Sequence, residues 1–95
     1  MIPHWINVAC DGNPGALTFI MEVVTLVGFD KAEEYFKKLL DNNIVGSELY
    51  MLWNDCCDRN TLIAMNIMHT HSIDDIVEHI NAKNGRGISY LKENE

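Results

Sequence analysis

The sequence predicts an all-α fold: a compact bundle of about five short helices, with an extended N-terminal arm and a short C-terminal tail. Three observations support this prediction. Apolar residues recur at helical spacing in five segments, turn-forming residues separate those segments, and most of the turns end in a residue that favours a helix start. The chain has 95 residues, so residues 1–95 are expected to form a single helical domain.

The first expected helix begins after the turn Gly12-Asn13-Pro14-Gly15. Asn13 is a favourable N-cap, and Pro14 suits the first position of a helix because its missing N–H would have no partner there. The helix should end at Gly28, which accommodates the left-handed conformation of a C-cap. Residues 1–11 are expected to be extended or irregular.

This first helix is apolar nearly all round. One face carries Leu17, Ile20, Met21, Val24 and Val27, and a second face carries Phe19, Val23 and Leu26. A helix of this kind is either central in its domain or shared with another subunit. We therefore expect a homo-oligomer. A charged residue at Phe19 or Val23 should give monomers if these side chains face a partner, or unfolded protein if they are core.

Four further helices are expected along the chain. The second should open at Asp30, with Glu33 completing a capping box, and end at Asp41-Asn42-Asn43. The predicted caps of the third, fourth and fifth helices are Ser47, Asn60 and Ser72. The buried face of the third should carry Leu49, Leu52, Trp53 and Cys56. The fifth should end at Asn84-Gly85.

The chain is acidic, with a formal net charge of −7 from 14 acidic and 7 basic residues. This balance argues against nonspecific binding of nucleic acid and against docking on an anionic membrane, because both need a basic surface. The apolar stretch from Ala16 to Val27 is too short to span a bilayer. No signal peptide is recognisable, and adjacent Cys56 and Cys57 rarely close a disulfide, so a cytoplasmic protein is expected.

Metal and catalytic chemistry have weak support. Cys56, Cys57, His69 and His71 lie near one another in sequence, but adjacent cysteines on a helix point about 100° apart and lack the usual zinc spacing. No cysteine-nucleophile signature surrounds any of the three cysteines. We therefore predict a binding protein that is not an enzyme, with no catalytic residues, metal or cofactor.

A small anionic ligand could bind at the first helix start, because free amides and the helix dipole attract anions there. The amides of Gly15 and Ala16 and the side chain of Asn13 would contact it. The same residues also make an ordinary N-cap, and the residues alone favour that interpretation, since Asp11 would repel an anion. The full candidate set is Gly12, Asn13, Gly15, Ala16, Trp5, Arg59 and Arg86, with Trp5 stacking on a flat ligand and the arginines closing over it.

Two segments carry a resemblance to a known group of proteins. They are 12–17, Gly-Asn-Pro-Gly-Ala-Leu, and 41–57, which contains Gly-Ser-Glu-Leu-Tyr at 46–50 and Asp-Cys-Cys at 55–57. Together they resemble a group of small proteins from tailed-bacteriophage and prophage genomes, whose pattern is G-N-P-G-A, then G-S-x-[LI]-[YW], then D-x-C. The resemblance covers most of residues 10–57, and the last third of the chain is less distinctive.

The resemblance implies a phage product that acts in the bacterial host cytoplasm. Small acidic phage proteins of this size are often inhibitors of host defence. They act by sequestering a nucleotide immune signal or by occupying a defence protein. The leading hypothesis is sequestration of a small, cyclic nucleotide signal at the Gly12–Ala16 helix start. The alternatives are an acidic inhibitor that binds a host defence protein and a structural or virion-associated subunit.

Overall fold

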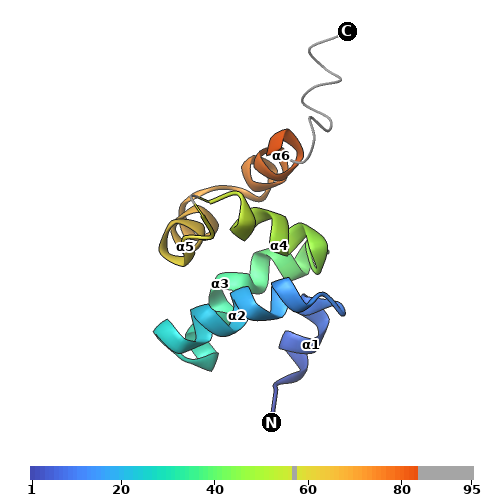
Figure 1. The fold of residues 1–95 in the computed structure, drawn as a ribbon, viewed down its shortest axis with the longest axis vertical. Helices are drawn as coiled ribbons and strands as arrows, with labels where there is room; N and C mark the ends of the chain where they lie inside the picture. The colour runs from blue at the N-terminus through green and yellow to red at the C-terminus, as the bar shows by residue number, and fades with distance from the viewer. Residues whose placement is uncertain (57, 84–95) are drawn as a thin grey trace, which may run out of the picture.

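All regular structure in the described part of the chain, residues 1–56 and 58–83 of a computed structural model, is helical (Figure 1). The helices are α1 (His4–Cys10), α2 (Pro14–Val27), α3 (Phe29–Asp41), α4 (Ser47–Asn54), α5 (Thr61–Thr70) and α6 (Ile73–Lys83). The all-α class is confirmed. The predicted C-terminal tail and the predicted helix end at Asn84-Gly85 lie outside the described residues.

The first eleven residues contain a helix, so the predicted extended N-terminal arm is wrong. In α1, Ile6 and Ala9 lie three residues apart, share one face and are almost fully buried. Pro3 precedes the helix without a side-chain capping bond, and Asp11 ends it in a left-handed conformation with φ 44°. Seven residues are too few to be stable alone, so α1 depends on its packing against α2, α3 and α4.

Helix α2 is the centre of the fold and contacts α1, α3, α4 and α5. Its start and end are confirmed: the Asn13 side chain caps it, and Gly28 follows it. The predicted left-handed helical conformation of Gly28 is wrong, because its φ of 87° is combined with an extended ψ of 168°. Phe19 and Val23 are both 0% exposed. Both side chains therefore belong to the core of the domain and do not face a partner subunit. A charge at either position should unfold the chain.

The core around α2 is aromatic. The Phe19 ring stacks on Trp53 of α4 at 5.4 Å between ring centroids and meets Phe36 of α3 edge-on at 5.3 Å. Such offset and edge-on arrangements are the favoured ones for aromatic pairs. The predicted buried residues of the third helix are confirmed: Leu49, Leu52 and Trp53 of α4 are buried, and so is Cys56, two residues beyond its end.

The starts of the remaining helices follow the predictions in part. Asn60 caps α5 through a bond from the Ile63 N–H, and the Ser72 hydroxyl accepts the N–H of Asp75 at the start of α6. The capping box at Asp30 is wrong, because α3 already begins at Phe29 after Gly28, which has no side chain to cap with. The predicted Ser47 cap is also wrong. Ser47 is the first residue of α4, and Gly46 is its N-cap.

Among the described residues, none of the helices is both long and apolar enough to traverse a bilayer.

Candidate ligand-binding sites

The Gly12 turn lies between α1 and α2, and its main polar groups bond to each other. The Asn13 side-chain oxygen accepts the Ala16 N–H at 2.9 Å. The Asn13 N–H donates to the carbonyl of Cys10 at 2.7 Å. One of the two amides predicted to hold an anion is therefore already bonded within the chain. The turn forms the N-cap that the residues favoured.

Gly15 is a packing position in this turn. A Cβ added to Gly15 would lie 2.3 Å from Cδ1 and 2.6 Å from Cε1 of Tyr50. Real Cβ atoms do not approach a ring this closely. The Tyr50 ring of α4 can therefore pack against the start of α2 only because Gly15 has no side chain. This glycine is explained by helix packing, without a ligand.

Gly46 joins the same region from the other side. Its N–H donates to the carbonyl of Ala9 at 2.8 Å, and its Cα faces Asp11, so an added Cβ would lie 3.1 Å from the Asp11 Cβ. Gly46 also has φ +61°, which favours glycine. Through these contacts and the Gly15–Tyr50 contact, segments 9–17 and 46–50 pack against each other. Nothing in the sequence links them in space.

The other three predicted site residues have separate surroundings. Trp5 belongs to α1 rather than to an irregular arm, and its ring packs 5.9 Å from that of Phe36, so the predicted setting of Trp5 is wrong. The Arg59 guanidinium lies 5.7 Å from the centre of the Trp53 ring, a cation–π distance. Arg86 lies outside the described residues.

A chain of hydrogen bonds runs beside Arg59 across three helices. The Trp53 indole N–H of α4 donates to the Thr61 hydroxyl of α5 at 3.1 Å, and that hydroxyl donates to the Glu22 carboxylate of α2 at 2.9 Å. Thr61 is buried, and its hydroxyl both accepts the bond from Trp53 and donates the bond to Glu22. Satisfied buried polar groups of this kind fix how helices pack, so we assign the chain a structural role.

A cleft lies between α3 and α5. Its volume is about 420 Å³. It is lined by Lys31, Glu34, Tyr35, Lys37, Lys38, Asp41, Met68 and His69. Three of the chain's seven lysines and arginines thus line one cleft of an acidic protein.

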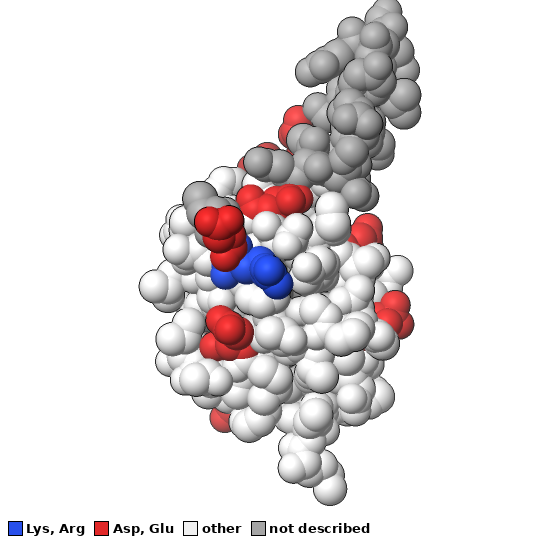
Figure 2. All heavy atoms as spheres, viewed as in Figure 1, with Lys and Arg blue, Asp and Glu red and all other residues white. Residues whose placement is uncertain are grey.

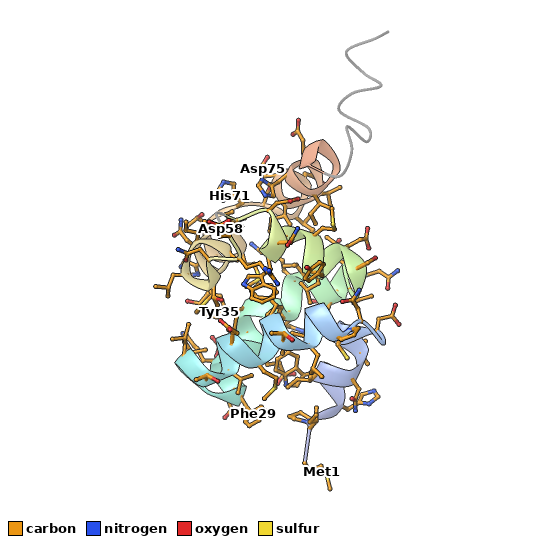
Figure 3. All side chains as sticks on the ribbon, in the orientation of Figure 1. Met1, Phe29, Tyr35, Asp58, His71 and Asp75 are labelled. Carbon is orange, nitrogen blue, oxygen red and sulfur yellow. The ribbon has the colours of Figure 1, made fainter. Side chains whose placement is uncertain are left out.

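Each cleft lysine has a polar neighbour. Lys38 reaches across to α5 and donates to the His71 carbonyl at 2.5 Å. In the view of Figure 3, Tyr35 lies below α5 and His71 above it. Lys31 pairs with Glu34 at 3.6 Å, and Lys37 pairs with Asp41 at 3.5 Å. Three lysines against two carboxylates leave a local positive surplus, and each ammonium keeps donors for a ligand.

Rings and an apolar contact complete the cleft. The Tyr35 and His69 rings stand 6.1 Å apart at 53°, one from each helix, and Met68 beside them is 1% exposed. A cleft with cations at its rim and rings in its wall suits a flat, negatively charged molecule. The sequence did not indicate this site, because the three lysines precede His69 by 31–38 positions. Only the packing of α3 on α5 places them beside His69.

Metal and thiol chemistry have no assembled site in the described residues. Across 1–56 and 58–83, nowhere do three His, Cys, Asp or Glu side chains converge around a position for a metal ion. The Cys10 thiol donates to the Asn7 carbonyl of the same helix, and the Cys56 thiol, two residues beyond the end of α4, donates to the Leu52 carbonyl.

Comparisons of the chain with protein-family models, with curated proteins and with solved structures gave no match.

Proposed function

We propose that this chain is a non-catalytic binding protein that sequesters a small anionic nucleotide in the α3–α5 cleft. The observation that carries the proposal is the gathering of Lys31, Lys37 and Lys38 around one cleft in a protein of net charge −7. The phage-type motifs extend the proposal: the protein acts as a homo-oligomer in the bacterial host cytoplasm, where it removes a nucleotide immune signal.

We place the ligand in the cleft and not at the Gly12 turn, because the cleft has more hydrogen-bond donors free to bind an anion. At the turn, Asn13 occupies the Ala16 N–H, and Asp11 adds a negative charge nearby. At the cleft, flexible ammonium groups can turn from exposed carboxylate partners to a phosphate, because surface ion pairs of this kind are weak.

The size of the cleft narrows the ligand. Small-molecule sites usually measure about 300–1,000 Å³. A cleft of about 420 Å³ suits one nucleotide unit, with its base against the Tyr35 and His69 rings and its phosphate toward the lysines. A cyclic di- or trinucleotide would place one unit there and leave the others for a second subunit or for solvent.

Calorimetric titration with cyclic di- and trinucleotides and ADP-ribose-type signals tests the proposal. The decisive variant carries both Lys31→Gln and Lys37→Gln. The two lysine side chains are 59% and 72% exposed, so their charges should not be needed for folding. A hydrogen bond to a charged group contributes roughly 1.5–3 kcal/mol, and exposure places these at the low end. We expect about tenfold weaker binding for each lysine lost.

Two matched variants locate the site. Arg59→Gln removes a basic residue that does not line the cleft, and Asn13→Asp adds a charge at the Gly12 turn while keeping a capping oxygen. Both should bind as the unchanged protein does. If Asn13→Asp abolishes binding and the lysine variant does not, the ligand binds at the turn and the cleft assignment is wrong. If no nucleotide binds to folded protein, the proposed function is wrong.

The alternative of an acidic protein-binding inhibitor has less support. Such an inhibitor would carry its carboxylates in one contiguous strip. On the face shown in Figure 2, the acidic side chains lie apart from one another, separated by uncharged surface. Capture of a host protein from lysate, lost steeply as salt is raised, would favour this alternative over nucleotide binding.

A further inference from the structure

The α3–α5 cleft contains two carboxylates, those of Glu34 and Asp41, among its three lysines. Each carboxylate has a lysine partner: Glu34 pairs with Lys31 at 3.6 Å, and Asp41 pairs with Lys37 at 3.5 Å. Two of the three positive charges in the cleft are therefore balanced within the chain. All four side chains of these pairs are more than half exposed, so a ligand meets the carboxylates as well as the ammonium groups.

Lys38 carries the remaining positive charge of the cleft. Across residues 1–56 and 58–83 no carboxylate pairs with it, and its ammonium group donates to the His71 carbonyl at 2.5 Å. Glu34 lies four residues before Lys38 in the sequence, and Asp41 lies three residues after it. Residues at these spacings are neighbours on a helix surface, with about 5–6 Å between Cβ atoms. Lys38 is therefore flanked along α3 by a carboxylate on either side.

We propose that Glu34 and Asp41 make the cleft selective for phosphodiesters, which have one negative charge per nucleotide, over nucleotides with terminal phosphates. One phosphate charge beside Lys38 balances the positive surplus of the cleft. A polyphosphate that continues along α3 in either direction approaches Glu34 or Asp41, and like charges at this range repel each other. If the polyphosphate takes Lys31 or Lys37, the carboxylate partner of that lysine is left unbalanced beside the added charge. The proposal rests on nucleotide binding in the cleft and names the class of nucleotide.

The charge outside the cleft acts in the same direction. The rest of the chain has four basic residues and twelve acidic ones. Phosphates that extend beyond the lysines therefore meet a negative field, which physiological salt largely screens only beyond about 8 Å. Additional phosphates thus lose affinity both inside the cleft and at its rim. A phosphodiester has no terminal phosphate and avoids both repulsions.

Calorimetric titration at physiological salt tests the selectivity with ligands that share a base and differ in charge. The probes are the cyclic monophosphates of adenosine, guanosine, cytidine and uridine, each compared with the linear monophosphate and the triphosphate of the same nucleoside. The cyclic ligand should bind most tightly and the triphosphate least. We expect about a threefold loss of affinity for each added charge, because exposed charges interact weakly. A triphosphate that binds as tightly as its cyclic counterpart, or more tightly, overturns the proposal.

Two single variants, Glu34→Gln and Asp41→Asn, test whether the carboxylates cause the selectivity. These side chains are 71% and 59% exposed, so both variants should fold, which circular dichroism checks. Each variant should bind the triphosphate about threefold more tightly and change the affinity for the cyclic ligand less. The matched control is Glu33→Gln, because Glu33 is an exposed residue of α3 that does not line the cleft. It should leave the preference unchanged.

The outcomes separate this proposal from the proposed function. If no nucleotide binds to the folded chain, the proposed function fails and the selectivity fails with it. If the Lys31→Gln, Lys37→Gln variant weakens nucleotide binding but triphosphates bind best, the cleft binds nucleotides and only the selectivity is wrong. If Glu33→Gln and Glu34→Gln narrow the preference equally, the net charge of the chain sets it, and the role assigned to Glu34 and Asp41 is wrong.

Discussion

Gly15→Ala is the sharpest test of how the start of α2 packs against α4. The new Cβ would lie 2.3 Å from Cδ1 of Tyr50, whereas carbon atoms pack at about 3.5–4.0 Å. The ring would have to move by more than about 1 Å. It is held by an edge-on contact with Trp53 at 6.2 Å and by its hydroxyl bond to Asn54 at 3.3 Å.

Two opposing effects set the size of the change. Alanine in place of glycine stabilises a helix by up to about 1 kcal/mol, mainly because the unfolded chain loses freedom. Overpacking a filled contact costs about 1–3 kcal/mol. We expect the packing cost to exceed the gain, with a net loss of about 1–2 kcal/mol in the free energy of unfolding. For a domain of this size that lowers Tm by roughly 5–15 °C.

Urea unfolding followed by circular dichroism gives the required free energies. The control is the same substitution in a Tyr50→Ala background, where the ring is gone. There Gly15→Ala should be neutral or stabilise by about 0.4–1 kcal/mol. The change in sign between the two backgrounds measures the contact directly. If Gly15→Ala costs the same in both, or raises stability while Tyr50 is present, the glycine is needed for some other reason and the packing argument fails.

Two further substitutions test the polar contacts of α2. Thr61→Val should lower the free energy of unfolding by about 1–3 kcal/mol, because it removes the acceptor of the buried Trp53 indole N–H. Thr61→Ser keeps the hydroxyl and should lower it less. Equal losses in urea unfolding would contradict the assigned bond. Asn13→Ala should cost about 0.5–2 kcal/mol by freeing the Ala16 N–H, and Asn13→Asp should retain most of the stability. A thermal scan in which alanine and aspartate behave alike would show that the cap contributes little.

Local signals in the sequence determined where several helices begin and end. Asn13 and Asn60 each accept the N–H three residues ahead, and Gly28 terminates α2 through its positive φ. These features involve residues within one turn of each other, so a linear pattern contains them. The same is true of the buried face of α4, which helical spacing alone placed.

Both misplaced boundaries lie beside a glycine with positive φ. At Asp30, a residue that suits an N-cap stood where the chain had already turned into α3 at Phe29. At Ser47, the glycine before it took the capping position, because φ +61° there also brings Gly46 against Asp11. In both cases a glycine with positive φ overrode a better side-chain cap one or two residues later.

Tertiary structure alone decided the role of each surface. Helix α1 exists because Ile6 and Ala9 find a core to enter, a contact that no seven-residue pattern contains. The lysine cleft exists because α3 packs on α5 and brings together residues about 30 positions apart. The Gly12 turn was predictable as a cap, but its packing against Tyr50 was not. Helix caps depend on residues that are neighbours in the sequence, whereas clefts and interfaces depend on which helix faces pack together.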